Sequence, residues 1–149
     1  MTSEIQSKTF LTPDEQKQVE EAIAQAELKT SAEICLVIAK HCWGDIKDKA
    51  FRLFHKHGLD QTAERNAVMI MIVTTNRELL IFGDKGIHEK VSDHFWVDVK
   101  DAMVNHFKTG NHVQGIIQGV HEVADQLIEH FPRQSDDVNE LSNEVIHED

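Results

Sequence analysis

The most strongly patterned part of the chain is a pair of apolar runs in its centre. The first, Ala67–Val73, contains seven consecutive apolar residues rich in Val and Ile, which is typical of a strand buried on both faces. The second, residues 79–82, follows a short polar turn and ends at Gly83. Two such runs joined by a short turn predict an antiparallel hairpin. The residues that follow the second strand should therefore lie beside those that precede the first.

A third apolar run, within residues 31–39, lies before this hairpin and is separated from it by a helical pattern. The sequence ICLVIA in this run predicts another buried strand. Asp45 follows a chain break at Gly44 and can cap a helix whose apolar spacing continues to about Gly58. A strand, a helix and a strand in this order form a βαβ unit, which predicts that the two strands run parallel.

Helical patterns also flank these strands on both sides. Residues 12–15 combine an N-cap Thr, a Pro at the first helical position and a Glu that closes a capping box, so a helix should begin there. After the hairpin, a helical turn at residues 86–91 precedes a helix capped by Ser92 or Asp93. The last predicted helix is capped by Asn111, carries a wide apolar stripe from Val113 to Phe131 and is stopped by Pro132.

The predicted elements combine into an α/β fold, a three-layer αβα sandwich in which a small mixed β-sheet has helices on both faces. We expect a flexible N-terminus at residues 1–10 and a single domain at residues 11–132. Residues 133–149 contain many acidic side chains and only one Lys or Arg, Arg133. We therefore expect this segment to be a disordered acidic tail.

Charge narrows the classes of function. Acidic residues outnumber basic ones by 26 to 15, which gives a formal net charge of −11, so no nucleic-acid partner is expected. No apolar run approaches the ~18 residues that span a bilayer, and the N-terminus lacks a signal-peptide pattern. We therefore expect a cytoplasmic protein without a membrane partner. Cys35 and Cys42 form no disulfide framework, and Cys35 is expected to be a small buried apolar residue.

The predicted strand directions bring several polar side chains to one rim of the sheet. Glu33 begins the first strand, and Asn66 precedes the second, parallel strand. The third strand leads to Asp84, and the turn after it leads to Asp93. Carboxylate and amide oxygens are the ligands that Ca²⁺ and Mg²⁺ prefer, so these four residues predict a site for a divalent metal ion. Arg65 could pair with one carboxylate or hold an anionic group beside the metal.

Each of these residues also has a structural interpretation. Asp84 and Asp93 suit helix caps, and Arg65 suits a surface ion pair. The opposite rim offers a cluster of residue types that would suit zinc, although its spacing matches no structural zinc pattern; it consists of His41, Cys42, Asp45, Asp48 and Asn76. The sequence contains no nucleotide-binding glycine loop and no nucleophile turn, so hydrolysis would need a metal-bound water.

Four stretches together resemble the TPM-domain family over about residues 11–131; they are AELKTSAEICLVI, RNAVMIMIV, RELLIFGDKGIHEKVSD and GNHVQGIIQGV. The resemblance implies an αβα sandwich around a mixed sheet, binding of divalent cations and at best weak acid phosphatase activity. By position it places the family's acidic residue before the first strand on Glu27 or Glu33, its Asn on Asn66 and its Asp after the glycine turn on Asp93. Many relatives have Asn-Gly where this chain has Asn66-Ala67, and many carry a signal peptide and a C-terminal membrane helix.

Three functions are consistent with these features. The first is a module that binds Ca²⁺ or Mg²⁺ and acts by interaction or regulation. The second is a metal-dependent phosphatase on small phosphoesters, with Arg65 on the phosphate. The third is an adaptor whose acidic tail contacts a basic protein partner.

Overall fold

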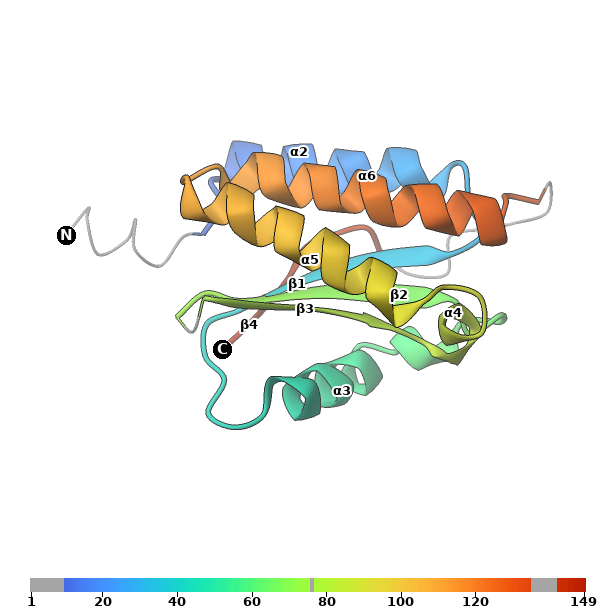
Figure 1. Ribbon diagram of the computed structural model, residues 1–149, viewed down its shortest axis with the longest axis horizontal. Coiled ribbons are helices and arrows are strands. Elements are labelled where there is room, and N and C mark those ends of the chain that lie inside the picture. Colours follow the sequence, from blue (N-terminus) through green and yellow to red (C-terminus); the bar gives the residue numbers. More distant parts are fainter. Residues whose placement is uncertain (1–9, 76, 135–141) are drawn as a thin grey trace.

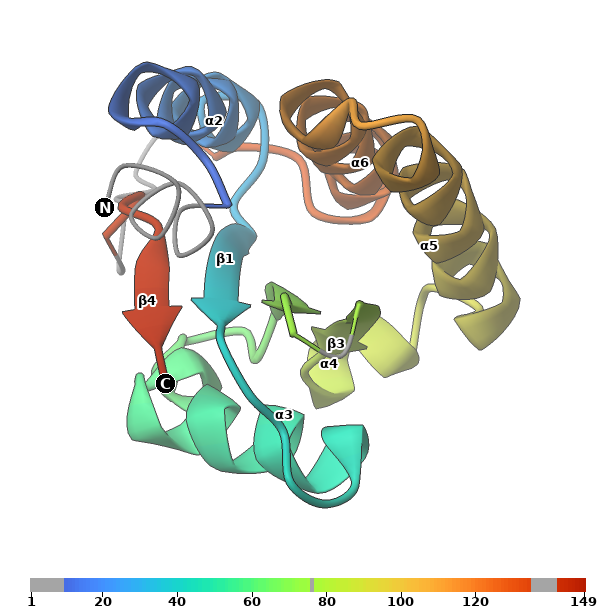
Figure 2. The same ribbon diagram turned by 90° about the vertical axis from the view of Figure 1, so that its left-hand side faces the viewer.

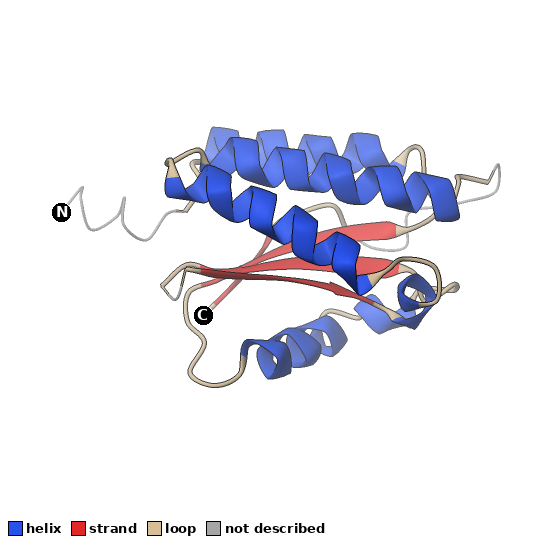
Figure 3. Cartoon of the chain, viewed as in Figure 1, coloured by secondary structure: helices blue, strands red, loops and turns tan. Residues whose placement is uncertain are grey.

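The structure of the protein is a computed structural model that describes residues 10–75, 77–134 and 142–149. A four-stranded mixed sheet with strand order β3-β2-β1-β4 lies between two layers of helices (Figure 1, Figure 3). The strands are β1 (Glu33–Ala39), β2 (Ala67–Val73), β3 (Glu78–Gly83) and β4 (Ile146–Glu148). The helices are α2 (Pro13–Glu27), α3 (Ile46–Lys56), the 3₁₀ turn η1 (Leu59–Gln61), α4 (Lys85–His88), α5 (Asp93–Lys108) and α6 (His112–His130).

Helices α2, α5 and α6 cover one face of the sheet, and α3 covers the other (Figure 1, Figure 2). Successive side chains along a strand point to opposite faces of the sheet, so β1, β2 and β3 each contribute to two hydrophobic cores, one under each helix layer. Val68, Ile70 and Ile72 of β2 belong to the core under α2, α5 and α6, whereas Met69 and Met71 belong to the core under α3. The three-layer αβα sandwich predicted from the sequence is thereby confirmed.

The strand pairing follows the predicted directions. β1 and β2 are parallel, with Glu33 opposite Ala67, and β2 and β3 are antiparallel, with Ile70 opposite Ile81. The capping box at Thr12 is present, and Asp45 caps α3 by accepting a hydrogen bond from the backbone N–H of Lys47 at 2.7 Å. These local sequence signals therefore fix where α2 and α3 begin.

The C-terminal segment differs from the expected disordered tail. Residues 146–148 form β4, a short strand parallel to β1, and Val145 is buried in the core under α2. The expectation fails here because two β-branched residues, Val145 and Ile146, pack against the domain, and Glu148 forms an ion pair with Lys56 of α3. The predictions for residues 1–9 and 135–141 lie outside the described residues.

Every helix in the described part of the chain is too short or too polar to cross a lipid bilayer. This finding agrees with the absence of a membrane-spanning run in the sequence.

Candidate functional site

The starts of β1 and β2 and the end of β3 meet at one rim of the sheet. Glu33 at the start of β1 lies opposite Ala67 at the start of β2. The backbone N–H of Asp84 donates to the carbonyl of Ala67 at 3.0 Å, and that of Gly86 donates to the carbonyl of Arg65 at 2.9 Å. The structure therefore brings three of the four predicted ligands, Glu33, Asn66 and Asp84, to this rim, and all three are buried.

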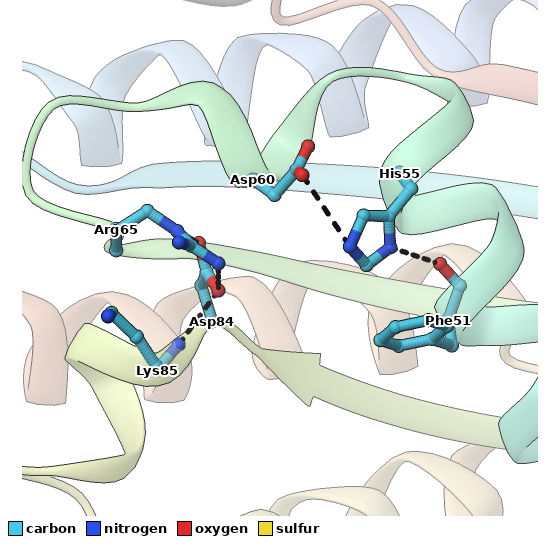
Figure 4. Close-up of polar contacts among 6 residues, drawn as sticks. All are labelled: Phe51, His55, Asp60, Arg65, Asp84 and Lys85. Carbon is cyan, nitrogen blue, oxygen red and sulfur yellow. Dashed lines mark hydrogen bonds and ion pairs between the residues drawn. The ribbon is translucent and has the colours of Figure 1, made fainter.

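Asp84 is held by two structural interactions. Both of its carboxylate oxygens accept hydrogen bonds from Arg65, Oδ2 from Nε at 2.6 Å and Oδ1 from Nη2 at 2.8 Å (Figure 4). Oδ1 also accepts from the backbone N–H of Lys85 at 2.8 Å, which makes Asp84 the N-cap of α4. The hydrogen bond to Asp84 raises the pKa of Arg65. Asp84 thus has two structural roles, as the N-cap of α4 and as the partner of Arg65 in an ion pair.

The backbone around this ion pair is tightly fitted. Arg65 adopts a left-handed conformation with φ of 53°. A Cβ atom on Gly86 would lie 2.5 Å from the carbonyl oxygen of Glu64 and 2.6 Å from that of Arg65. Only glycine allows α4 to approach the start of β2 so closely. The same corner contains Asp60, which lies 3.5 Å from the Nε2 atom of His55 (Figure 4).

Asp93 does not join the buried residues of the rim. It is the first residue of α5, whose N-cap is Ser92. Its side chain is 85% exposed, and its carboxylate lies 3.4 Å from Nδ1 of His88. The sequence predicted either Ser92 or Asp93 as the cap of this helix, and the structure has Ser92 in that role. Asp93 instead lies in the first turn of the helix and faces solvent.

A further carboxylate, Glu27, is present at the rim. Glu27 is the last residue of α2, is 2% exposed and accepts a hydrogen bond from the backbone N–H of Ile34 at 2.8 Å on Oε2. Burial raises its pKa to about 9, helped by the charge and a hydrogen bond of Glu33 and opposed by the Ile34 N–H and by Arg133. Glu27 therefore carries a proton at neutral pH.

Several polar atoms of this rim are buried without a partner. Asn66 is 1% exposed, and its backbone N–H donates to Thr62 Oγ1 at 3.1 Å. Its side-chain atoms Oδ1 and Nδ2, like Oε1 of Glu27, have no hydrogen-bond partner within the described parts of the chain. A buried polar atom of this kind costs roughly 1–3 kcal/mol when it stays unsatisfied. The carboxylates of Glu27 and Glu33 and the amide oxygen of Asn66 are the donor types that fit a hard divalent cation.

The described residues contain no group of three or more His, Cys, Asp or Glu side chains that could hold a metal ion. Because Arg65 and the backbone N–H of Lys85 already engage the oxygens of Asp84, the side chains left at this rim that could offer oxygens to a cation are those of Glu27, Glu33 and Asn66. At the opposite rim, Asp45 serves as a helix cap and His41 stacks on Trp43 with ring centroids 5.3 Å apart. Asn76 lies outside the described residues.

Cys35 is buried beneath α3, as expected of a small apolar residue. Burial raises the pKa of its thiol to about 12, with a further contribution from the nearby carboxylate of Glu27. The thiol is therefore protonated at neutral pH and is a poor nucleophile or metal ligand.

Both the sequence and the fold of this chain are similar to those of known proteins. A family model described as the TPM domain matches residues 5–126. The NMR structure of the BA42 protein from the psychrophilic bacterium Bizionia argentinensis is 37% identical, with a TM-score of 0.87 over 93% of this chain and 96% of that chain. The NMR structure of the N-terminal domain of a P. gingivalis protein is 20% identical, with a TM-score of 0.67 over 84% and 83% of the two chains, and shows the fold alone. No curated protein matches the chain.

Proposed function

The chain belongs to the TPM-domain family, and on this premise we propose that it is a module that binds Ca²⁺ or Mg²⁺ through Glu27, Glu33 and Asn66. The observations that carry the proposal are the buried, unsatisfied amide of Asn66 and the pair of buried carboxylates of Glu27 and Glu33 at the same rim of the sheet. A cation would give Oδ1 of Asn66 and Oε1 of Glu27 the partner that they lack within the described parts of the chain.

Charge balance supports a divalent ion at this rim. Two buried carboxylates cannot both be ionised at low cost, and the raised pKa of Glu27 reflects that cost. A proton on Glu27 removes one of the two negative charges, so Glu27 and Glu33 can both stay buried at lower cost. A divalent cation would supply two positive charges against two carboxylates, so its binding would displace the proton and leave the rim neutral.

The proposed ligand set keeps two of the four ligands predicted from the strand directions, leaves out the other two and adds Glu27, which the family resemblance offered as an alternative to Glu33. Glu33 and Asn66 remain, and Glu27 joins them because it is buried against Glu33. Asp84 is left out because Arg65 and the N-terminus of α4 occupy both of its oxygens. Asp93 is left out because its side chain faces solvent. Water would complete the coordination shell, since Ca²⁺ takes about six to eight oxygen ligands and Mg²⁺ about six.

We assign this module an interaction or regulatory role in preference to catalysis. Arg65, the residue expected to hold a phosphate, already donates from Nε and Nη2 to Asp84. A phosphate ester would have to compete with this buried carboxylate. Phosphatase activity and an adaptor role for the acidic tail stay predictions.

Replacing Glu33 by Gln is expected to weaken Ca²⁺ and Mg²⁺ binding by about tenfold or more, because the charge of the ligands sets affinity at hard-cation sites. Asp93→Asn is the matched control: it removes the same charge from an exposed side chain, so affinity should stay at the parental value. Calorimetric titration of the full chain after treatment with a chelator measures both. The proposed site is refuted if Asp93→Asn loses affinity while Glu33→Gln retains it.

A further inference from the structure

The C-terminal segment lies along the edge of β1 that β2 leaves open. β2 pairs with all seven residues of β1, from Glu33 to Ala39, whereas β4 pairs with only the last three. Beyond the strand, the backbone N–H of Lys40 donates to the carbonyl of Glu148 at 3.1 Å. Three residues of parallel pairing at a sheet edge form a small contact, so the side chains must supply much of the attachment.

The segment lies between α2 on one side and α3 on the other (Figure 2), and apolar and polar contacts join it to both helix layers. Val145 is buried under α2, and Ile146 packs against the core under α3. The backbone N–H of Val145 donates to Oε2 of Glu20 at 2.8 Å, and Nε2 of His147 lies 2.7 Å from Oε1 of Gln16. Residues 145–147 thus lie between α2 and α3, against the edge of β1.

Charge fixes the end of the segment. Nζ of Lys56 lies 3.1 Å and 2.9 Å from the two carboxylate oxygens of Glu148, and Nε2 of His57 lies 2.7 Å from Oε2. Lys49 donates from Nζ to the carbonyl of Asp149 at 2.9 Å. The hydrogen bond from Lys56 is the main cause that lowers the pKa of Glu148. We call Lys49, Lys56 and His57 the basic cradle.

The positive charge of the basic cradle contrasts with the negative net charge of the whole protein. Acidic residues outnumber basic ones by 26 to 15 in the chain, yet α3 carries four Lys or Arg residues and a single Asp. A concentration of cations beside an open strand edge suits an acidic segment that adds to the sheet as a strand.

We propose that the edge of β1 and the basic cradle form a recognition groove for an extended acidic segment of a partner protein. Residues 145–149, Val-Ile-His-Glu-Asp, are its intramolecular occupant. The partner segment would carry two apolar residues, any residue, then Glu and a second acidic residue, and would pair parallel to β1. It would have to displace a tethered competitor, whose effective concentration is in the millimolar range for short linkers. This groove is separate from the proposed cation site, which lies at the other end of β1.

The test uses the full chain with Glu148→Lys, which places a cation against the basic cradle and should release β4. Glu144→Lys, at an exposed position of the same segment, is the matched control. Hydrogen exchange follows the backbone amides of residues 146–149, and the amides of β2 report whether the fold is retained. A fluorescent peptide with the sequence of residues 142–149 then reports on the groove. It should bind Glu148→Lys at least tenfold more tightly than it binds the parent chain or Glu144→Lys.

A charge exchange makes the test specific. Lys56→Glu should prefer a peptide with Lys in place of Glu148 over the natural peptide, because the cradle has lost its main cation. The proposal is overturned if Glu148→Lys keeps exchange protection in β4, or loses it and still binds no peptide. It is also overturned if sedimentation shows a dimer of the parent chain that Glu148→Lys cannot form, since the occupant would then be a second copy of this chain.

Discussion

Glu27→Gln is expected to be more stable than the parent chain above pH 7 when no divalent cation is present. The folded-state pKa of Glu27 is raised from 4.5 to about 9, so between these pH values the native state holds a proton that the unfolded chain has lost. The stability contribution of Glu27 is complete below pH 4.5 and is lost as the pH rises towards 9, by up to about 1.4 kcal/mol per pH unit. Gln carries no titrating proton and removes this slope.

Urea unfolding at pH 6 and pH 8 in the presence of a chelator measures the difference. Glu21→Gln, on the exposed face of the same helix, controls for the loss of one negative charge. The parent and Glu21→Gln should both lose stability between the two pH values, whereas Glu27→Gln should change much less. Parallel pH profiles for Glu27→Gln and the parent would show that Glu27 is ionised in the native state.

The affinity for Ca²⁺ or Mg²⁺ is expected to rise by about a hundredfold between pH 6 and pH 8. A cation at the proposed site must displace the proton of Glu27, whose pKa is raised to about 9, and the loss of one proton per ion changes affinity about tenfold per pH unit below that pKa. Titration at pH 6, 7 and 8 gives the slope. Asp93→Asn should show the same slope as the parent, because Asp93 lies in solvent. An affinity independent of pH would contradict exchange of a proton for the ion.

The central part of the fold could be predicted because its elements are encoded locally. The apolar run of β2 and the capping box at Thr12 each specify their structure within a few residues. β4 could not be predicted in this way, because its stability depends on contacts distant in sequence. Glu148 in isolation belongs to an acidic stretch, and only the folded domain places Lys56 of α3 and His57, the C-cap of that helix, against it.

The candidate site was partly predictable for a similar reason. Strand directions placed Glu33 and Asn66 at one rim, and the structure has them there. Strand directions do not specify the path of the chain after the third strand. The chain continues through α4 to the start of α5, where the side chain of Asp93 faces solvent. Glu27 had a local signal: it continues the spacing of four residues set by the buried residues Val19 and Ile23 of α2. A glutamate on an apolar stripe is a buried carboxylate, and such groups often have shifted pKa values.

The location of a bound ion tests the central proposal most directly. NMR of the full chain can follow the carboxyl carbons of Asp and Glu and the side-chain amide of Asn66 during titration with Ca²⁺ or Mg²⁺ at pH 8. We expect saturable shifts of the Glu27 and Glu33 carboxyl carbons and of the Asn66 amide, with little change at Asp93. Saturable shifts centred on Asp93, or on Asp45 at the opposite rim, with Glu27 and Glu33 unchanged would contradict the proposed site.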